Sequence, residues 1–420
     1  MSGDAVVQPP RRRLDAAAYH GDEKLGGGAV SDHRPVVISC DGHATGRPDD
    51  YLPYIESKFH EQYQEYAMGL RAQRAAARRA RQDGTSLFTD EGSFGLDDET
   101  GDDRDGEWNS AVRERVLEGE GVVGEVLFPN GGVPFGGFGE SAEHDLRAVG
   151  NRAYDRWLID FANQSPGRRA ALAMLFVHDL DACVSEIEWA KQNGMKGVII
   201  PTVPGDGLPP YMDRCYDPMW AACQDHELPV HVHGGGGTPS YGDYGVVSML
   251  MYATEATFFS ARNLWILLWS GVLDRFPRLQ LVLTETRADW VPDTLTLLDG
   301  IHRAPFFRNI ENTARLKPSE YFGRQVTIGA SFMAARDAAR RHEIGVGNLM
   351  WGADFPHVEG TWPRTKRSLQ ACFRGIPEAD VRAILTDNPA RIYGFDVGAL
   401  QSVADRVGLT MDELVGAETA

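Results

Sequence analysis

The sequence predicts a (β/α)8 barrel, in which eight parallel strands alternate with helices. Eight short apolar segments are separated by stretches of helical pattern, and this alternation is typical of the fold. The 420 residues exceed the roughly 250 that such a barrel needs, so one domain with insertions accounts for the length. Side chains of metal-binding type also recur at the ends of several apolar segments, which is where barrels place their active sites.

The barrel is expected to begin after an N-terminal arm. Residues 1–34 mix Pro, Gly, Arg and Asp without a period, which predicts a mobile arm. The β-branched run at 36–40 is then the first strand. An insertion at 51–120 follows, with a polar helix over 51–81 and then an acidic, glycine-bearing loop. Such a loop is usually a solvated surface, and a lid over the active site is the alternative.

Regular alternation of helices and strands follows the insertion. Residues 35–396 are assigned to the barrel and 397–420 to a C-terminal helical extension. Helices are expected at 143–162, 180–192, 218–226 and 288–301, and in a long apolar region that ends at Phe276-Pro277. Within 288–301, Pro292 is expected to break or restart the helix. The seven later strands are expected at 122–128, 171–176, 197–201, 229–233, 279–285, 325–329 and 348–354.

Composition and charge restrict the classes of partner. The 42 basic and 60 acidic residues give a net charge of −18, which argues against nonspecific binding of nucleic acid or of anionic membranes. Five cysteines without a CxxC pair predict reduced thiols and a cytoplasmic location. No signal peptide is indicated, because Arg11-Arg12-Arg13 has no apolar run behind it. The apolar segment from Val246 to Leu273 contains charged residues, so it predicts a buried or oligomer-facing helix rather than a membrane span.

The strongest chemical signal lies at 228–237, where a short apolar strand carries two histidines and ends in four glycines. Residues two apart in a strand share a face, so His231 and His233 point the same way. The glycines let the backbone pass close to whatever the histidines bind. His231 lies one pleat deeper, so we favour a core or supporting role for it and a metal-binding role for His233.

Other ligand-type side chains occupy matching positions. Asp41 and His43 follow the first strand, Glu285 the sixth and Asp354 the eighth, all at C-terminal strand ends. Two imidazoles with two carboxylates suit zinc, manganese, iron or cobalt, of which zinc and manganese lead. Taken singly, Asp41 could begin a turn, His43 could pack in the core and Asp354 could cap a helix. Their common position at one rim favours a metal site.

Several longer segments together resemble one enzyme family. They read ISCDGH at 38–43, LPVHVHGG at 228–235, SGVLDRFPRL at 270–279, WGADFPH at 351–357 and TDNPAR at 386–391. In this order they resemble the amidohydrolase-related family that includes aminocarboxymuconate-semialdehyde decarboxylase and the aromatic acid decarboxylases. The resemblance covers roughly residues 36–395 and implies a (β/α)8 barrel with one divalent metal ion.

The same resemblance implies which residues bind the metal. It places ligands at Asp41, His43, His233 and Asp354, in agreement with the strand-end argument. The Asp41-Gly42-His43 segment resembles the carboxylate-x-histidine branch, which leaves the choice of metal open. Related hydrolases with two metals usually carry a bridging lysine or glutamate at the end of the fourth strand. This chain has Ile-Pro there, so the resemblance implies one metal.

Further residues are candidates for catalysis or substrate binding. Glu285, which stands where the wider family often has histidine, is either an acid/base or a support for a ligand histidine. His357 either transfers a proton at the rim or caps the next helix, and His178 after the third strand is another rim candidate. Arg47 and Arg287 closely follow ligand-bearing strand ends and are the predicted clamps for a substrate carboxylate. The alternative is that both are ordinary surface arginines.

Three functions compete. The first is non-oxidative decarboxylation of a small unsaturated or aromatic acid, in which His357 or Glu285 protonates the carbon that loses carbon dioxide. The second is hydrolysis of an ester, lactone or amide, in which a rim carboxylate such as Asp354 takes a proton from metal-bound water. The third is a barrel that binds a partner without catalysis. A homodimer is also predicted, through an apolar segment that contains Phe258, Phe259, Trp265 and Trp269.

Overall fold

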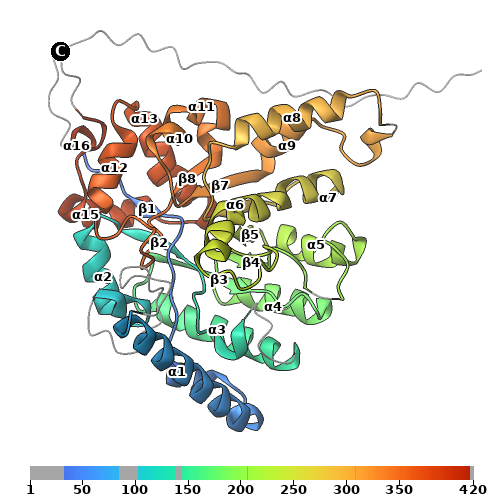
Figure 1. The fold of residues 1–420 in the computed structure, drawn as a ribbon. Helices are drawn as coiled ribbons and strands as arrows, with labels where there is room; N and C mark the ends of the chain where they lie inside the picture. Colours follow the sequence, from blue (N-terminus) through green and yellow to red (C-terminus); the bar gives the residue numbers. More distant parts are fainter. Residues whose placement is uncertain (1–32, 85–102, 138–143, 206, 308, 417–420) are drawn as a thin grey trace, which may run out of the picture. The chain divides into compact units, whose positions relative to one another are not determined.

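The computed structural model contains the predicted barrel (Figure 1). It describes residues 33–84, 103–137, 144–205, 207–307 and 309–416. Eight strands form one sheet in the order β1 to β8, and each pairs in parallel with the next. The eight predicted strands are confirmed, with bounds that differ by a few residues. They are β1 (Ile38–Ser39), β2 (Gly124–Leu127), β3 (Arg169–Met174), β4 (Gly197–Ile199), β5 (Val230–His233), β6 (Leu281–Thr284), β7 (Val326–Ala330) and β8 (Leu349–Trp351).

The first and last strands meet and close the barrel. The Cys40 amide donates to the Trp351 carbonyl at 2.9 Å, and Gly42 forms a parallel bridge with Phe355. Because all eight strands run in one direction, their C-terminal ends form a single rim. The segments that follow β1 and β8 lie side by side at that rim.

Helices occupy the predicted intervals, with one correction. The helix α4 has the predicted range 180–192, and α8 begins at Val291 with Pro292 in its first turn, where the missing N–H breaks no helical bond. The helix predicted at 51–81 begins only at His60. The residues before it, Pro48–Tyr54, contain two prolines and form a short 3-10 segment instead. The helices are α1 (His60–Gln82), α2 (Ser110–Gly119), α3 (His144–Asn163), α4 (Leu180–Gln192), α5 (Asp217–Asp225), α6 (Val246–Trp269), α7 (Val272–Arg275), α8 (Val291–Arg303), α9 (Pro318–Gln325), α10 (Ala335–Ala339), α11 (Arg341–Ile344), α12 (Thr365–Phe373), α13 (Glu378–Arg382), α14 (Asn388–Tyr393), α15 (Val397–Val407) and α16 (Met411–Val415).

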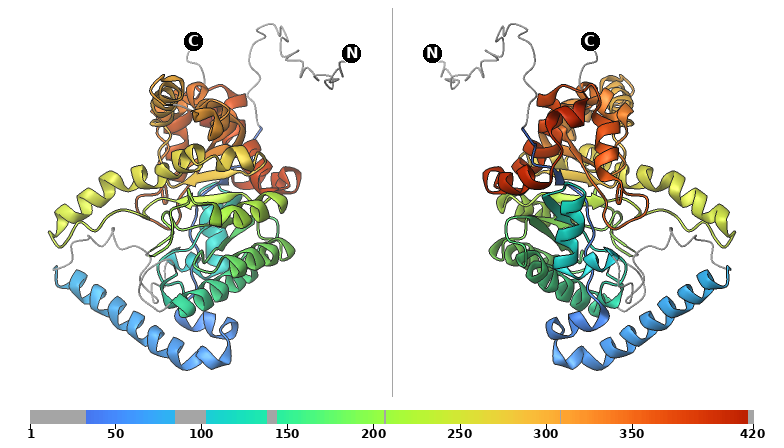
Figure 2. Two further views of the ribbon diagram at one scale, coloured as in Figure 1. Left: turned by 90° about the vertical axis from the view of Figure 1, so that its right-hand side faces the viewer. Right: turned by 90° about the vertical axis from the view of Figure 1, so that its left-hand side faces the viewer.

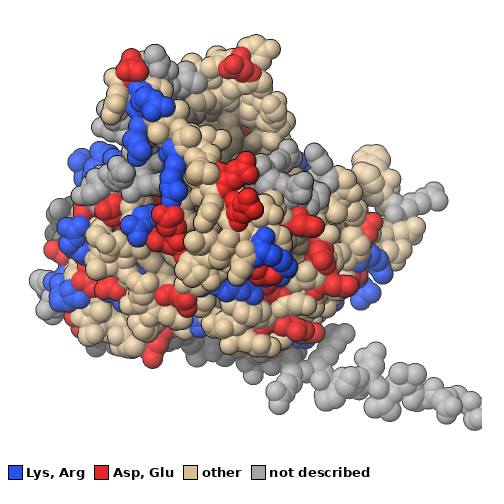
Figure 3. All heavy atoms as spheres, turned by 90° about the horizontal axis from the view of Figure 1, so that it is seen from below, with Lys and Arg blue, Asp and Glu red and all other residues tan. Residues whose placement is uncertain are grey.

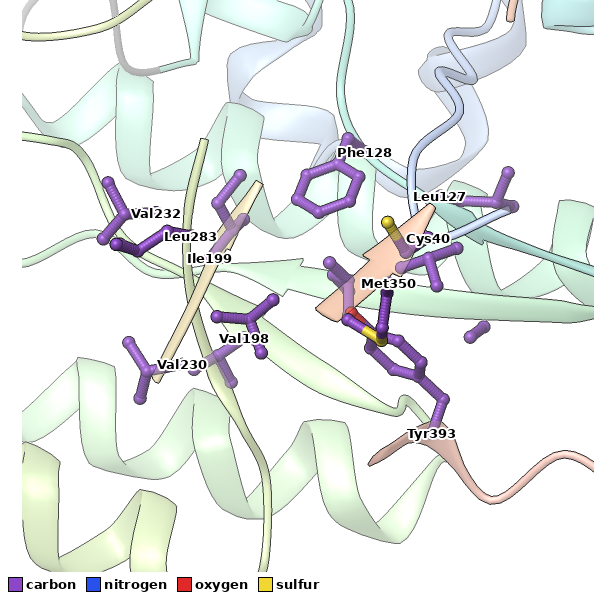
Figure 4. Packing of buried hydrophobic residues seen from close by; sticks show 14 of the residues in the cluster. Cys40, Leu127, Phe128, Val198, Ile199, Val230, Val232, Leu283, Met350 and Tyr393 are labelled. Atoms are coloured by element: carbon purple, nitrogen blue, oxygen red, sulfur yellow. The ribbon is translucent and has the colours of Figure 1, made fainter. Parts of the chain in front are cut away.

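The strands contribute a packed apolar interior (Figure 4). Burial of each aliphatic side chain contributes about 1.5–3 kcal/mol to the free energy of folding. Tyr393 of α14 is part of the same cluster, so a helix from the C-terminal part of the chain also packs on this interior. A filled barrel leaves its C-terminal rim as the place for chemistry. The buried side chains labelled in Figure 4 are Cys40, Leu127, Phe128, Val198, Ile199, Val230, Val232, Leu283, Met350 and Tyr393.

Parts of the predicted organisation lie outside the described residues. The predicted arm at 1–34 is described only from residue 33, and the acidic run at 97–102 lies outside the described ranges. Asp103–Glu107 forms a 3-10 turn ahead of α2. In the predicted C-terminal extension, Leu400 of α15 belongs to a small apolar cluster with Val36 and with Ile38 of β1.

The surface and the cysteines bear on partners and compartment. Basic and acidic side chains are interspersed over most of the face in Figure 3. Among the described helices, none has the combined length and apolarity that a membrane span requires. All five cysteines are free thiols, and Cys215 alone is exposed.

A buried ion pair joins the insertion to the barrel. The Arg113 guanidinium of α2 makes two hydrogen bonds of 2.7 Å to the carboxylate of Glu125 in β2. It also donates to the carbonyls of His43 at 2.7 Å and Gly106 at 3.0 Å. The side chains of Arg113 and Glu125 are 0% and 3% exposed. The pair therefore supports the backbone that carries His43.

Loss of Arg113 should strongly destabilise the protein. We expect Arg113→Met to lower the free energy of unfolding by about 3 kcal/mol, because a buried carboxylate loses its main partner. Removal of one partner of a buried ion pair usually costs about 3–5 kcal/mol. The lower value is expected here because Arg169 remains 3.4 Å from Glu125. Urea unfolding measures the change. The control is Arg278→Met in an exposed pair with Asp225, which should cost less than about 1 kcal/mol; equal losses in the two variants would contradict the assignment.

Candidate metal centre and active site

Five ligand-type side chains converge at the C-terminal rim. Asp41 and His43 follow β1, His233 ends β5, Glu285 follows β6 and Asp354 follows β8. Asp41, His43 and Asp354 are buried, while the side chains of His233 and Glu285 are 16% and 13% exposed. The Asp354 amide donates to the Asp41 carbonyl at 3.0 Å, which fixes the two aspartates relative to each other.

Oxygen acceptors orient the two histidines. His43 Nδ1 lies 2.8 Å from the Pro129 carbonyl, and His233 Nδ1 lies 3.1 Å from both the Gly234 carbonyl and Glu285 Oε2. We therefore assign a ring proton to Nδ1 in both rings, so Nε2 is the atom that can bind a metal once it is deprotonated. Oxygen partners of this kind commonly orient metal-binding histidines.

The Nε2 atoms face the two aspartates. His43 Nε2 lies 3.1 Å from Asp354 Oδ1 and 3.6 Å from Asp41 Oδ1. His233 Nε2 lies 3.3 Å from the same oxygen of Asp41. The four predicted ligands are thus brought together, and their ligand atoms are directed towards one another.

This donor set fits a divalent cation. Both carboxylate oxygens of Asp354 and His43 Nε2 are buried, and none makes a hydrogen bond with any other residue in the described ranges. Buried polar atoms are normally hydrogen bonded, so these atoms have the capacity to bind a further group. Two imidazoles and two carboxylates suit zinc or manganese. Glu285 and Asp354 also have positive φ values of 53° and 58°, a costly conformation that concentrates at functional sites.

His357 lies beside the same carboxylate. Its Nδ1 is 3.0 Å from Asp354 Oδ1, and its ring stacks on that of His43 with centroids 4.0 Å apart. Its Nε2 is 3.3 Å from Asn130 Oδ1, which must be the acceptor atom because it also accepts from the Gly131 amide. Both ring nitrogens therefore face acceptors. Burial disfavours a charged ring, but the Asp354 carboxylate outweighs it and raises the pKa of His357 to about 9.

Carboxylates dominate the electrostatics of the rim. Burial opposes a charge on His233, yet Glu285 and Asp41 raise the pKa of its imidazole well above the usual value. Burial acts against ionisation of Asp354, but His357 and His43 hold the pKa of that carboxyl below its usual range. Negative charge is thus retained at a buried point, which favours a bound cation.

His231 takes a different place from His233. Its Nδ1 lies 3.0 Å from the Val198 carbonyl and its Nε2 lies 3.0 Å from the Tyr393 hydroxyl, so both nitrogens have protein partners. Burial lowers the pKa of His231 to about 4. These contacts agree with the core role favoured from its deeper position in the strand.

A cavity of about 460 Å³ opens next to His233. The ends of β3, β4 and β5 contribute to its walls, and its polar lining includes His178, Thr202 and Arg147. His178 stacks on Phe176 with centroids 4.8 Å apart, and the buried Arg147 of α3 lies 5.6 Å from the same ring. A volume of this size suits a small organic substrate.

The two predicted arginine clamps lie elsewhere. Arg47 is 54% exposed and forms an ion pair with Asp50, three residues along the chain. Arg287 pairs with a carboxylate two residues away and lines a separate cavity between α6 and α8. Local acidic partners thus hold both guanidinium groups away from the cavity beside His233. The arginine that lines that cavity is Arg147.

Three further polar residues contact the site. Asn130 follows β2 and faces His357, and the Ser331 hydroxyl after β7 donates to Asp41. A search for polar residues just after the C-terminal end of every predicted strand would have found both. Glu359 also has a carboxylate oxygen near His357, but nothing in the sequence distinguishes it from a surface glutamate.

Comparisons with known proteins identify the family. A family model described as Amidohydrolase matches residues 131–395, which is more than half of the chain. The chain belongs to the amidohydrolase family. This is a family of metal-dependent enzymes, in agreement with the ligand atoms gathered at the rim. No curated protein sequence matches this amidohydrolase at a significant level.

Solved structures share its fold. A 5-carboxyvanillate decarboxylase from Sphingomonas paucimobilis has 21% identity and a TM-score of 0.61, and the match covers 86% of this chain and 99% of that chain. An amidohydrolase from Mycobacterium avium subsp. paratuberculosis K-10 has 19% identity, a TM-score of 0.63 and the same coverage of 86% and 99%. A dihydroxybenzoic acid decarboxylase from Polaromonas sp. JS666, solved with manganese and the inhibitor 2-nitroresorcinol, has 17% identity and a TM-score of 0.59, with coverage of 86% and 97%.

Glu107 adds a pH-dependent group behind the site of this amidohydrolase. It is 1% exposed, and burial raises the pKa of its carboxyl to about 8 against the opposing effects of His357 and Arg113. Its Oε1 accepts from Asn130 Nδ2 at 3.3 Å. Because the pKa is higher in the folded state, the neutral carboxyl contributes its full stabilisation at pH values below the unfolded-state pKa, near 4.5. This contribution is lost as the pH rises through the folded-state pKa of about 8.

Glu107→Gln should therefore flatten the dependence of stability on pH. The neutral amide cannot ionise, so we expect a smaller fall in melting temperature between about pH 5 and pH 8.5. Thermal unfolding at a series of pH values measures it. Glu343→Gln, at a residue whose side chain is 58% exposed, is the control and should follow the wild type. A slope unchanged by Glu107→Gln would show that Glu107 does not titrate in this range.

Proposed function

We propose that this amidohydrolase is a metal-dependent, non-oxidative decarboxylase of a small unsaturated or aromatic carboxylic acid. The observation that carries the proposal is the position of His357, a proton donor set against the candidate metal ligand Asp354 at 3.0 Å. The activities named for two of the similar structures, decarboxylation of 5-carboxyvanillate and of dihydroxybenzoic acid, support the same chemistry.

The proposed ligands are Asp41, His43, His233 and Asp354, and they would hold one zinc or manganese ion. The similar structure that contains manganese supports the second choice. When bound, the ion supplies Lewis acidity towards the substrate carboxylate and the oxygen beside it. Glu285 contacts the outer nitrogen of His233, so in this proposal it orients that ring.

His357 is the proposed acid. Decarboxylation breaks the bond between the carboxylate carbon and its neighbour, leaves the electron pair on the neighbour and releases carbon dioxide. The neighbouring carbon then takes a proton from His357. Its Nε2 makes a long contact of 3.3 Å with Asn130, which a substrate can replace. Asp354 stabilises the charged ring before transfer, and solvent restores the proton afterwards.

The cavity beside His233 is the proposed substrate site. Its volume of about 460 Å³ accommodates a single-ring acid, and Phe176 and His178 offer stacked rings on one wall. In this proposal His178 contacts the substrate rather than the metal. Arg147 lies over Phe176 and supplies positive charge on the same wall, so it replaces the predicted arginine clamps.

A product analysis tests the reaction type. The metal-loaded enzyme is incubated with a panel of unsaturated and aromatic acids in water labelled with heavy oxygen. Loss of carbon dioxide without uptake of label supports decarboxylation. Label in the product of an ester, lactone or amide would replace the proposal by hydrolysis, and turnover of no compound by a metal-loaded protein would favour a binding role.

Two predictions about the cellular form remain proposals. The exposed free thiol of Cys215 supports a reducing, cytoplasmic compartment. The apolar surface of α6 supports a homodimer.

A further inference from the structure

The described part of the insertion packs against the loop that follows β8. In Figure 2 the blue α1 extends away from the barrel, whereas the cyan α2 lies against it. The 3-10 turn Asp103–Glu107 precedes α2, and a Cβ on its Gly106 would lie 3.0 Å from the Phe355 ring. The Arg113 guanidinium of α2 lies 5.1 Å from the centre of the same ring. Phe355 belongs to the segment 354–357, which carries a candidate metal ligand and the proposed acid.

Glu107, the last residue of this turn, contacts the site through Asn130. Its Oε1 accepts a hydrogen bond from Asn130 Nδ2 at 3.3 Å, and its backbone carbonyl accepts from the Thr45 amide at 3.1 Å. The Thr45 hydroxyl in turn accepts from the Asn130 backbone amide at 3.0 Å. Glu107 is buried, so water competes little for its carboxyl oxygens. The insertion therefore holds both the backbone and the side chain of Asn130.

Asn130 holds one end of the His357 ring. Its Oδ1 accepts from the Gly131 amide at 2.8 Å, so Oδ1 is the atom that faces His357 and Nδ2 is the atom that faces Glu107. His357 Nε2, 3.3 Å from that oxygen, must then be the donor in this contact. The other ring nitrogen, Nδ1, lies 3.0 Å from Asp354 Oδ1. The ring is therefore held at both nitrogens, and one of the two contacts depends on the orientation of the Asn130 amide.

We propose that Glu107 is a positioning residue for the proton donor His357 and that it acts through Asn130. The inference rests on the proposed decarboxylation, in which His357 Nε2 gives its proton to the substrate carbon. Asn130 is partly exposed, so without an acceptor behind it the amide can turn towards solvent. The His357 ring would then be held at Nδ1 alone, and its Nε2–H could turn away from the substrate. A buried acceptor oxygen at position 107 prevents this, whether or not it carries a charge.

A double-mutant cycle on the metal-loaded full chain tests the path through Asn130. Glu107→Met removes the acceptor and should lower kcat about tenfold, the value of one well-placed hydrogen bond, with KM and metal content unchanged. Asn130→Ala should lower kcat by at least as much, and the double variant should be no slower than Asn130→Ala alone. Effects that multiply in the double variant would show that Glu107 acts independently of Asn130 and would overturn the proposal.

Glu107→Gln distinguishes the hydrogen bond from the charge. The amide keeps an acceptor oxygen for Asn130, so kcat should stay within about twofold of the wild type. Asp103→Asn is the matched control in the same turn, because Asp103 is 48% exposed and pairs with Arg115 at 2.7 Å. It should leave kcat unchanged. A Glu107→Gln enzyme as slow as Glu107→Met, or an Asp103→Asn enzyme as slow as either, would overturn the proposal.

A measurement without turnover separates this inference from the proposed function. In the zinc-loaded protein, nitrogen-15 NMR of the histidine rings should show a His357 Nε2–H signal, which His357→Gln identifies by removing it. The signal should persist in Glu107→Gln and be lost through exchange with water in Glu107→Met and in Asn130→Ala. A signal that persists in Glu107→Met would overturn the positioning role, and Asn130→Ala carries the same decision should Glu107→Met not fold. The expected losses without turnover of any acid would support the positioning of His357 and overturn the decarboxylation alone.

Discussion

Asp354→Asn is expected to abolish both metal binding and turnover. Asp354 is buried, both its carboxylate oxygens make no hydrogen bond with the other described residues, and it lies 3.1 Å from His43 Nε2. The amide keeps the shape but removes the negative charge and one ligand oxygen. Loss of a group that only orients a ligand costs about 10–100-fold in metal affinity, so loss of the ligand itself should cost more than about 100-fold.

Metal content after dialysis and the rate on the best substrate of the panel measure this result. Asp289→Asn is the matched control, because Asp289 also follows a barrel strand, β6, but forms ion pairs with Arg287 and Arg336. The control should keep its metal. An Asp354→Asn protein that retains about one ion per chain with an unchanged rate would mean that the ligand set is wrong.

His357→Gln is expected to slow the chemical step while leaving metal binding unchanged. A positioned proton donor contributes about 10²–10⁴-fold to a rate, so kcat should fall by that factor. Metal content should stay the same, because the two Nε2 ligands and both aspartates remain. Single-turnover kinetics on the metal-loaded variant measure the effect on the chemical step.

His302→Gln is the control for this substitution. His302 lies at the end of α8 with its ring nitrogen 2.9 Å from the Ala314 carbonyl, away from the candidate ligands. It should leave kcat within about twofold of the wild type, since it touches no reacting group. If His357→Gln also lost its metal, His357 would be a ligand rather than the proton donor.

The architecture and the position of the candidate metal centre were predictable for one physical reason. Alternating apolar strands and helices imply parallel strands, and parallel strands bring their C-terminal ends to one rim. Asp41, His233 and Asp354 are far apart in the chain, yet their places at strand ends sufficed to group them. The spacing within β5 also separated His231 from His233, since the deeper residue meets the core partners Val198 and Tyr393.

Side chains set by local competition or by helix packing were not predictable in the same way. Arg47 and Arg287 follow strand ends, but Asp50 and Asp289 lie within reach and hold their guanidinium groups. Arg147 reaches the cavity from α3, and the pattern of a helix does not say which of its turns will face a site. The proline-containing start of the predicted 51–81 helix shows the same limit, because tight 3-10 turns replace α-helix over its first residues.

Metal analysis of the purified protein, before and after chelation and reconstitution with zinc or manganese, tests the central claim most directly. The geometry of Asp41, His43, His233 and Asp354 predicts about one tightly bound ion per chain, restored after chelation. A protein that binds neither ion after reconstitution, while remaining folded, would contradict the metal centre and the decarboxylation built on it.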